Sequence, residues 1–155
     1  MKSSDSFLLS VKNLKIGFRQ GDAIKTAVEG ISFDLKPGES LGIVGESGSG
    51  KSITSLAVMG LLPPNAIIQS GEIKLNLDKP VDVLNASDDK LRTLRGKTIS
   101  MIFQEPMSAL NPLEKCGNQV AEAIRVHKKL NKKELKSQVL ELFERVELPD
   151  PEKAY

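Results

Sequence analysis

The chain has 155 residues, of which 39% are hydrophobic and 27% charged, a composition that excludes general disorder and is typical of a globular domain. The formal net charge of +2 is too small to indicate a nucleic-acid partner. The one cysteine excludes an internal disulfide, and the longest apolar run, residues 56–62, is far shorter than the ~20 residues of a membrane-spanning helix.

The single cysteine, Cys116, has no metal-ligand companions in the sequence, and we expect it to be buried as a small apolar residue. Residues 1–18 lack the apolar region and the cleavage site of a signal peptide, so we interpret the start of the chain as mature protein.

The first two predicted elements form an antiparallel pair. Apolar and polar residues alternate loosely over residues 7–18, which predicts a strand with one irregularity near Asn13. A turn at residues 20–22 leads to a second strand over residues 27–35, and Pro37-Gly38 ends it.

The middle of the chain predicts a strand, a glycine-rich loop and a helix in that order. Residues 40–44 are short and apolar, as in a buried parallel strand, and residues 52–62 predict a helix that Pro63-Pro64 ends. Short strands follow at 71–77 and 81–84, then a short helix through Leu94, for which residues 87–89 offer a cap. A further strand is predicted at 98–103.

Residues 104–112 predict a loop with two prolines, and the remainder of the chain predicts helices. Amphipathic patterns cover 117–127 and 131–146, the second with Asn131 as its cap, and prolines at 149–151 end the pattern. The change from strands to helices predicts a subdomain boundary within the loop.

One segment carries a specific chemistry. It matches the pattern G-x-x-x-x-G-K-[ST] in full: Gly45, Glu46, Ser47, Gly48, Ser49, Gly50, Lys51 and Ser52. Glycines let the backbone curl around an anion, and the following helix adds its positive N-terminal end. Lys51 offers a cation to the β and γ phosphates, and Ser52 offers a hydroxyl to Mg²⁺. The alternative is a chance glycine-rich turn, against which the flanking strand and helix argue.

Two blocks of sequence resemble the ABC ATPases. Residues 27–52 resemble the approach to their Walker A motif, and residues 101–112, which read MIFQEPMSALNP, resemble their Q-loop. The F-Q-[DE]-P-M-x-x-L-N-P form is similar to the subfamily that imports oligopeptides, dipeptides and sometimes nickel. The resemblance implies an α/β fold: a P-loop NTPase core with an antiparallel β subdomain over residues 1–112, and the start of a helical subdomain over 113–155, incomplete.

The resemblance also implies roles for individual residues. Gln104 matches the Q-loop glutamine, which contacts the Mg²⁺ and attacking-water region, so Gln104 and Lys51 are the candidate catalytic residues and Ser52 and Gln104 the candidate Mg²⁺ contacts. Phe18 stands where the family places an aromatic ring that stacks on the adenine of ATP. The alternatives are a surface glutamine in a loop and a core phenylalanine at the end of a strand.

The family's signature segment, Walker B aspartate, catalytic glutamate and switch histidine have no counterpart in these 155 residues. We therefore expect the chain to bind ATP without hydrolysing it efficiently, and the full-length protein to be an ATPase. The implied partners are a membrane permease, a second ATP-binding domain and, indirectly, a solute-binding protein. The implied location is the cytoplasmic face of the inner membrane.

Three alternatives belong to other classes. A non-transport ABC ATPase would not associate with a permease, and the M-S-A-L-N-P tail of the Q-loop block argues against it. A small-molecule kinase or GTPase would share the phosphate motif but would have no reason to carry the Gln104 block. An inert fragment would lack turnover.

Overall fold

The computed structural model describes residues 7–105 and 109–155 of the chain. They divide into two compact units, Met1–Arg95 and Gly96–Tyr155. We call them the sheet unit and the helical unit and describe each by itself. The division into functional subdomains at residues 112 and 113 remains a prediction. Within the described ranges, no helix combines the length and apolar character needed to span a bilayer.

The sheet unit is built around two long antiparallel strands, β1 (Leu9–Gln20) and β2 (Ala23–Leu35). They are joined by a tight turn in which Gly21 has φ 61°, a conformation that glycine adopts at little cost. The predicted antiparallel pair is confirmed, and β2 begins four residues earlier than expected because pairing continues to the turn, where Gln20 faces Ala23.

The predicted irregularity in β1 is a β-bulge at Asn13. Val11 and Leu14 pair with Phe33 and Ile31 of β2, so β1 has one residue more than β2 over this interval. Val11 and Leu14 are three positions apart and would face opposite sides of a regular strand, yet both are fully buried. The bulge, in which Asn13 adopts φ 46°, brings both side chains into one core.

The bulge is fixed by side chains from both neighbouring strands. The Asn13 amide donates to Ser32 Oγ of β2 at 2.8 Å, and the Ser70 hydroxyl of the third strand donates to the Asn13 carbonyl at 3.2 Å.

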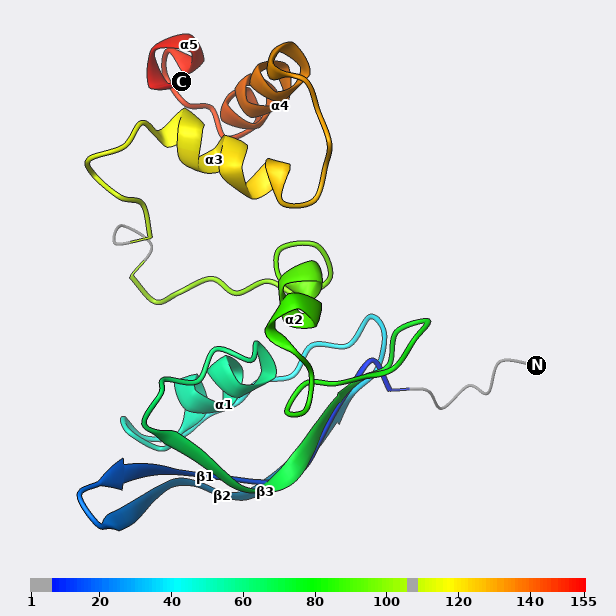
Figure 1. Cartoon of the computed structure of the whole chain (residues 1–155), viewed down its shortest axis with the longest axis vertical. Helices are drawn as coiled ribbons and strands as arrows, with labels where there is room; N and C mark the ends of the chain where they lie inside the picture. Colours follow the sequence, from blue (N-terminus) through cyan, green and yellow to red (C-terminus); the bar gives the residue numbers. More distant parts are fainter. Residues whose placement is uncertain (1–6, 106–108) are drawn as a thin grey trace. The chain divides into compact units, whose positions relative to one another are not determined.

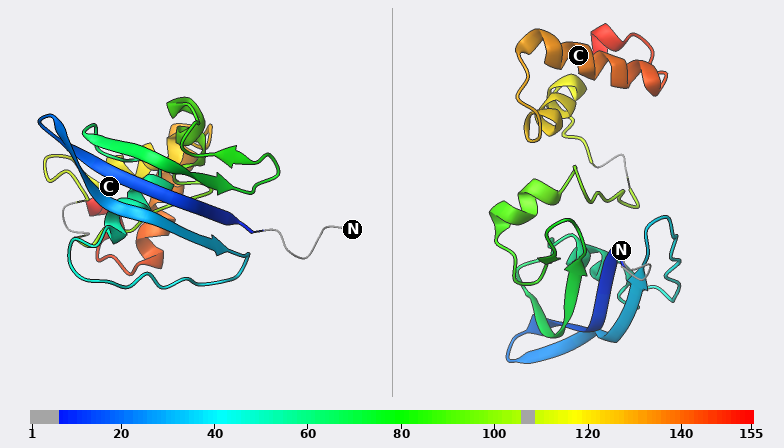
Figure 2. Two further views of the ribbon diagram at one scale, coloured as in Figure 1. Left: turned by 90° about the horizontal axis from the view of Figure 1, so that it is seen from below. Right: turned by 90° about the vertical axis from the view of Figure 1, so that its right-hand side faces the viewer.

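Among the described residues, the sheet has four strands in the order β2-β1-β3-β4, all antiparallel (Figures 1 and 2). Strand β3 (Ala66–Leu75) begins five residues before the predicted strand at 71–77, because Phe18 to Leu9 of β1 offer it a partner over that whole length. Strand β4 is only Val81–Asp82, so the strand predicted at 81–84 is confirmed but shorter.

Helices α1 and α2 both belong to the sheet unit. Helix α1 (Lys51–Val58) ends four residues before the predicted end at Leu62, because Gly60 adopts φ 63° and closes the helix. The Gly60 amide donates to Ala57 O and the Leu61 amide to Leu56 O, which is a Schellman motif. Helix α2 (Asp88–Leu94) begins as predicted, with Ser87 Oγ accepting from the Lys90 amide at 3.3 Å.

The predicted strands at 40–44 and 98–103 are wrong. Neither segment is a strand, apart from an isolated bridge at Ile99. The side chains of Val44 and Ile102 are 92% and 91% exposed. A short apolar run becomes a strand only beside a partner with free backbone groups, and within the described residues neither segment has such a partner.

The helical unit contains α3 (Cys116–Arg125), α4 (Lys132–Arg145) and the short α5 (Pro151–Ala154), which the sequence analysis did not predict. Asn131 caps α4 as predicted, in a reciprocal box with Glu134. The core of the unit comes from α3 and α4: Ala121, Leu135, Val139 and Phe143. Cys116, expected to be buried, is exposed because it begins α3, outside this core.

Candidate nucleotide site

The glycine-rich loop requires glycine for two separate reasons. The backbone φ is 80° at Gly48 and 90° at Gly50, values that other residues rarely adopt. A Cβ on Gly50 would lie 2.6 Å from the Ala27 carbonyl oxygen and 2.8 Å from Val28 Cγ2. Any side chain there would force the loop away from β2. The close approach of Gly50 to β2 therefore fixes the loop against the sheet.

The first part of the loop is tightly curled. A Cβ on Gly45 would lie 2.7 Å from Ser49 Oγ, and the Ser49 amide donates to the Glu46 carbonyl at 3.2 Å. The side chains of Glu46 and Ser47 are exposed.

The loop leads directly into α1. Thr54 donates to the Gly50 carbonyl from both its amide and its hydroxyl, each at 2.9 Å, which joins the first turn of the helix to the loop. Gly50 is the N-cap and provides no side-chain cap, so the first amides of α1 face the loop without a competing acceptor from it. This end of a helix favours anions.

The Lys51 ammonium is bound by the loop itself. It donates to the carbonyl oxygens of Gly45 at 2.8 Å and Glu46 at 2.7 Å, and to Ser49 Oγ at 3.3 Å. Two carbonyl dipoles therefore hold the cation inside the curl of the loop. Phosphate oxygens that enter the curl could replace these acceptors, since an ionic acceptor makes the stronger hydrogen bond.

Phe18 lies in the same pocket as the loop. The pocket has a volume of about 210 Å³ and is lined by Phe18, Ala27 and residues 48–53. Phe18 is half-buried near the end of β1, where it pairs with Lys25 of β2 and Ala66 of β3. An aromatic face thus stands beside the candidate phosphate cradle, within one compact unit.

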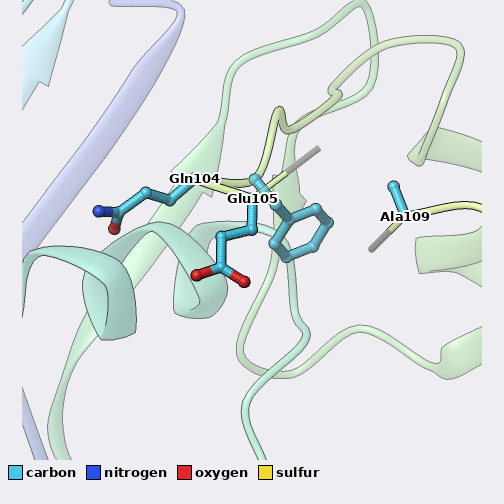
Figure 3. Close-up of a pocket in the computed structure, with 4 residues that line it drawn as sticks. Gln104, Glu105 and Ala109 are labelled. Carbon is cyan, nitrogen blue, oxygen red and sulfur yellow. The ribbon is translucent and has the colours of Figure 1, made fainter. Parts of the chain in front are cut away.

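Gln104 belongs to the helical unit, where it lines a separate pocket with Phe103, Glu105 and Ala109. Figure 3 shows the Gln104 side chain extending from the loop in a direction away from Ala109. Residues 106–108 of the predicted Q-loop lie outside the described residues.

No group of three or more His, Cys, Asp or Glu side chains that could hold a metal ion exists among the described residues. A dedicated metal cage is not what Mg²⁺ needs, because Mg²⁺ keeps several waters and is commonly held by few protein ligands together with substrate phosphates. The exposed hydroxyl of Ser52, one residue after Lys51, fits that kind of site.

Two side chains that the sequence analysis did not single out make contacts near the predicted residues. Arg95 donates from Nε to the Met59 carbonyl at 2.9 Å and from Nη2 to the Gly60 carbonyl at 2.5 Å, at the C-terminal end of α1. Gln119 of α3 accepts from the Asn111 amide at 2.9 Å and donates to the carbonyls of Asn111 and Glu114. The partners of Arg95 are distant in sequence, and those of Gln119 lie in the loop that precedes α3, so no motif of the sequence indicates either contact.

Comparison with known protein families finds a match over most of this chain. Residues 28–154 match the ABC transporter family, and the match includes the glycine-rich loop, α1 and Gln104. The chain belongs to the ABC transporter family. The recognition from the two sequence blocks is therefore confirmed.

Relatives within the ABC transporter family carry names from peptide transport. The dipeptide transport ATP-binding protein DppD of Bacillus subtilis is 48% identical over 93% of this chain and 42% of its own length. The oligopeptide transport ATP-binding protein OppD of the same organism is 45% identical over 94% and 40%, and OppD of Escherichia coli is 42% identical over 94% and 42%. The chain thus spans less than half the length of these relatives.

Solved structures agree with the family. The dimeric post-hydrolysis state of the ATP-binding cassette MJ0796, bound to ADP and Pi, matches with a TM-score of 0.74 and 25% identity over 92% of this chain and 58% of that one. A second dimeric structure of MJ0796, a bacterial ABC transporter cassette, matches with a TM-score of 0.73 and 26% identity. The predicted α/β fold of the P-loop NTPase type, present in part, is confirmed.

Proposed function

We propose that this chain is the nucleotide-binding portion of an ABC transporter subunit that couples MgATP binding and hydrolysis to the import of peptides or similar small solutes. The observation that carries the proposal is that Phe18 lines the same pocket as Gly48, Gly50 and Lys51. The import of peptides rests on the names of the relatives, which share 42–48% identity with this chain.

In this proposal the phosphates of ATP enter the curl of the glycine-rich loop. The Lys51 ammonium exchanges the Gly45 and Glu46 carbonyls for β- and γ-phosphate oxygens. The backbone amides of the loop and of the first turn of α1 donate to the remaining oxygens. Ser52 contacts the Mg²⁺, and Gln104 contacts the Mg²⁺ and the attacking water from its loop. The ring of Phe18 stacks on adenine.

The proposed partners follow from the family. A membrane permease receives the motion of the Gln104 loop, a second ATP-binding domain completes a dimer, and a solute-binding protein delivers the substrate to the permease. The proposed location is the cytoplasmic face of the inner membrane, as a peripheral subunit. MJ0796, the structural relative, is described as dimeric, which supports the pairing. We further propose residues 1–112 as the nucleotide-binding core and 113–155 as the beginning of a helical subdomain.

The test is a calorimetric titration of MgATP into the purified chain, with Lys51→Ala beside it and Lys129→Ala as the matched control, since Lys129 is an exposed lysine outside the loop. A charge-assisted hydrogen bond contributes about 1.5–3 kcal/mol, so we expect Lys51→Ala to weaken binding roughly tenfold to a hundredfold. Lys129→Ala should bind as the unsubstituted chain does. Equal affinities for Lys51→Ala and Lys129→Ala would contradict the phosphate role of Lys51.

The role of Phe18 has its own test. Base stacking on an aromatic side chain contributes about 1–3 kcal/mol by alanine substitution, so Phe18→Ala should weaken ATP binding roughly tenfold and leave inorganic triphosphate binding unchanged. Phe18→Tyr keeps the aromatic face and should bind ATP normally. A parallel loss for both ligands would mean that Phe18 supports the core of the sheet unit instead.

Turnover and nucleotide choice distinguish the remaining alternatives. We propose that this 155-residue chain binds MgATP without efficient hydrolysis. Phosphate release that is steady and that Lys51→Ala abolishes would contradict this. A preference for GTP over ATP would favour a GTPase, and binding without permease association in the full-length protein would favour a non-transport ABC ATPase.

A further inference from the structure

Helix α1 is short, and few of its residues are buried. It has eight residues, Lys51–Val58, and only Thr54 and Ala57 are buried. Isolated helices of this length are marginal in water, so the direction of such a helix depends on its tertiary contacts. Its first two residues, Lys51 and Ser52, are the residues that the proposed nucleotide site requires. A small tilt of α1 would displace both.

The two ends of α1 are held by different means. At the N-terminal end, Gly50 lies against Ala27 of β2, and Thr54 donates twice to the Gly50 carbonyl. At the C-terminal end, the Schellman motif uses the carbonyls of Leu56 and Ala57, and the carbonyls of Met59 and Gly60, just after the helix, take no part in it.

Arg95 binds both of these carbonyls at once. Its Nε donates to Met59 O at 2.9 Å and its Nη2 to Gly60 O at 2.5 Å, and the side chain is half-buried. The planar guanidinium presents two donors in a fixed arrangement, which an ammonium cannot do. A cation at the C-terminal end also complements the helix dipole.

The backbone of Arg95 is itself anchored to α2. The Arg95 amide donates to the Leu91 carbonyl at 3.0 Å as the C-cap of α2, and Leu91 is itself buried. A Cβ on Gly60 would lie 2.6 Å from Leu91 Cδ1, so α2 packs directly against the end of α1. Arg95 therefore joins α1 to a helix that is already capped and packed.

We infer that Arg95 is a positioning residue of the nucleotide site: by holding the carbonyls of Met59 and Gly60, directly after α1, it fixes the direction of the helix that carries Lys51 and Ser52. This inference rests on the proposed function. Arg95 touches neither phosphate nor metal in this role and acts only through α1.

The experiment compares Arg95→Gln and Arg95→Lys with Arg92→Gln, which removes an exposed arginine of α2, three residues before Arg95. MgATP and inorganic triphosphate are titrated calorimetrically well below the unfolding midpoint of each variant. Hydrogen exchange is measured without nucleotide at the amides of Met59, Gly60 and Leu61, which close the end of α1.

We expect Arg95→Gln to weaken both ligands roughly tenfold, because small displacements of binding groups by remote substitutions have effects of this order or larger. The three amides should exchange faster in this variant. Arg95→Lys keeps the charge but loses the fixed pair of donors of the guanidinium. The affinity of Arg95→Lys for both ligands should therefore lie between those of Arg95→Gln and the unsubstituted chain. Arg92→Gln should match the unsubstituted chain in both measurements.

The inference is overturned if Arg95→Gln lowers the unfolding midpoint yet binds both ligands normally, since Arg95 would then serve stability alone. Unchanged exchange at the end of α1 would overturn it as well, and this result requires no nucleotide. Failure of the unsubstituted chain to bind MgATP would instead contradict the proposed function, while the exchange data would still decide whether Arg95 holds α1. Should Arg95→Gln fail to fold, Arg95→Lys gives the same comparison with the charge retained.

Discussion

The two units of this chain differ in the sequence separation of the residues that stabilise them. In the helical unit the residues that define each helix are close in sequence, as in the box formed by Asn131 and Glu134. In the sheet unit the partners are distant, and Leu9 pairs with both Leu35 and Leu75. The candidate phosphate loop belongs to the second kind, because Gly50 depends on contact with Ala27. The predicted chemistry therefore depends on long-range pairing.

The largest expected effect is in the core of the helical unit, where a substitution tests whether the two units unfold separately. Leu135 is 1% exposed, and a buried leucine replaced by alanine costs about 2–5 kcal/mol in the free energy of unfolding. We expect Leu135→Ala to increase hydrogen exchange in α3 and α4 and to leave β1 protected. Leu142→Ala is the control, since Leu142 is on the same helix and 38% exposed. An equal loss of protection in β1 would show that the units do not unfold separately.

The sheet unit can be tested at its closest backbone approach. Gly71 has φ 110°, and a Cβ there would lie 2.6 Å from Leu14 Cα, so backbone must shift to admit it. We expect Gly71→Ala to lower the free energy of unfolding by about 3 kcal/mol, the upper end of the cost of such strain. Gly21→Ala also places alanine at positive φ but meets nothing within 4 Å, and it should cost about 1 kcal/mol. Urea denaturation of the two variants measures the difference in their free energies of unfolding. Equal losses would mean that the backbone of β3 shifts at Gly71 without a cost in stability.

A smaller effect on stability is expected at the N-terminal cap of α4 in the helical unit. Asn131→Ala removes the cap of α4 and should cost about 1 kcal/mol. Lys115 occupies the same position before α3 but provides no side-chain cap, so Lys115→Ala should leave thermal stability unchanged. If the two substitutions shifted the unfolding midpoint equally, the capping box would not contribute to stability.

The smallest effect we expect is at a contact in the helical unit between the loop at Asn111 and helix α3. Gln119→Ala removes the acceptor of the Asn111 amide and should accelerate its hydrogen exchange by an amount equivalent to about 0.5–1.5 kcal/mol. Asn118→Ala alters the neighbouring exposed side chain and should have no such effect. Unchanged exchange at Asn111 in Gln119→Ala would mean that the loop is held by other groups.

The same contrast explains how far the sequence predicted the fold. The caps at Ser87 and Asn131 were predicted correctly because a cap and its helix are adjacent in sequence. The strands predicted at 40–44 and 98–103 were wrong because a short apolar run indicates a preference, and a strand also requires a partner. The predicted end of α1 was wrong because the helix closes at Gly60, whose φ is 63°, before the chain reaches Pro63-Pro64.

For the candidate site, the sequence predicted the glycine-rich loop and proposed Phe18, and the structure places Phe18 in the same pocket as that loop. It did not indicate Arg95, although the residue lies directly after α2. An arginine at the end of a helix is common, and its partners, Met59 and Gly60, can be identified only once α1 and α2 are packed together. A sequence motif indicates the residues proposed to bind the ligand, whereas a residue proposed to position those residues can be identified only from tertiary contacts.

The bulge at Asn13 has a consequence for changes in chain length. Removing Asn13 would leave Val11 and Leu14 two positions apart, and a regular strand would then bury both. The pairings of Lys12 with Glu72 and Lys15 with Ser70 show the same extra residue on the side facing β3, so one deletion would remove this register shift from both ladders. Deleting Lys15 instead would put Leu14 and Ile16 on opposite faces. Within β1, the bulge is the position where the protein can lose a residue and keep its core.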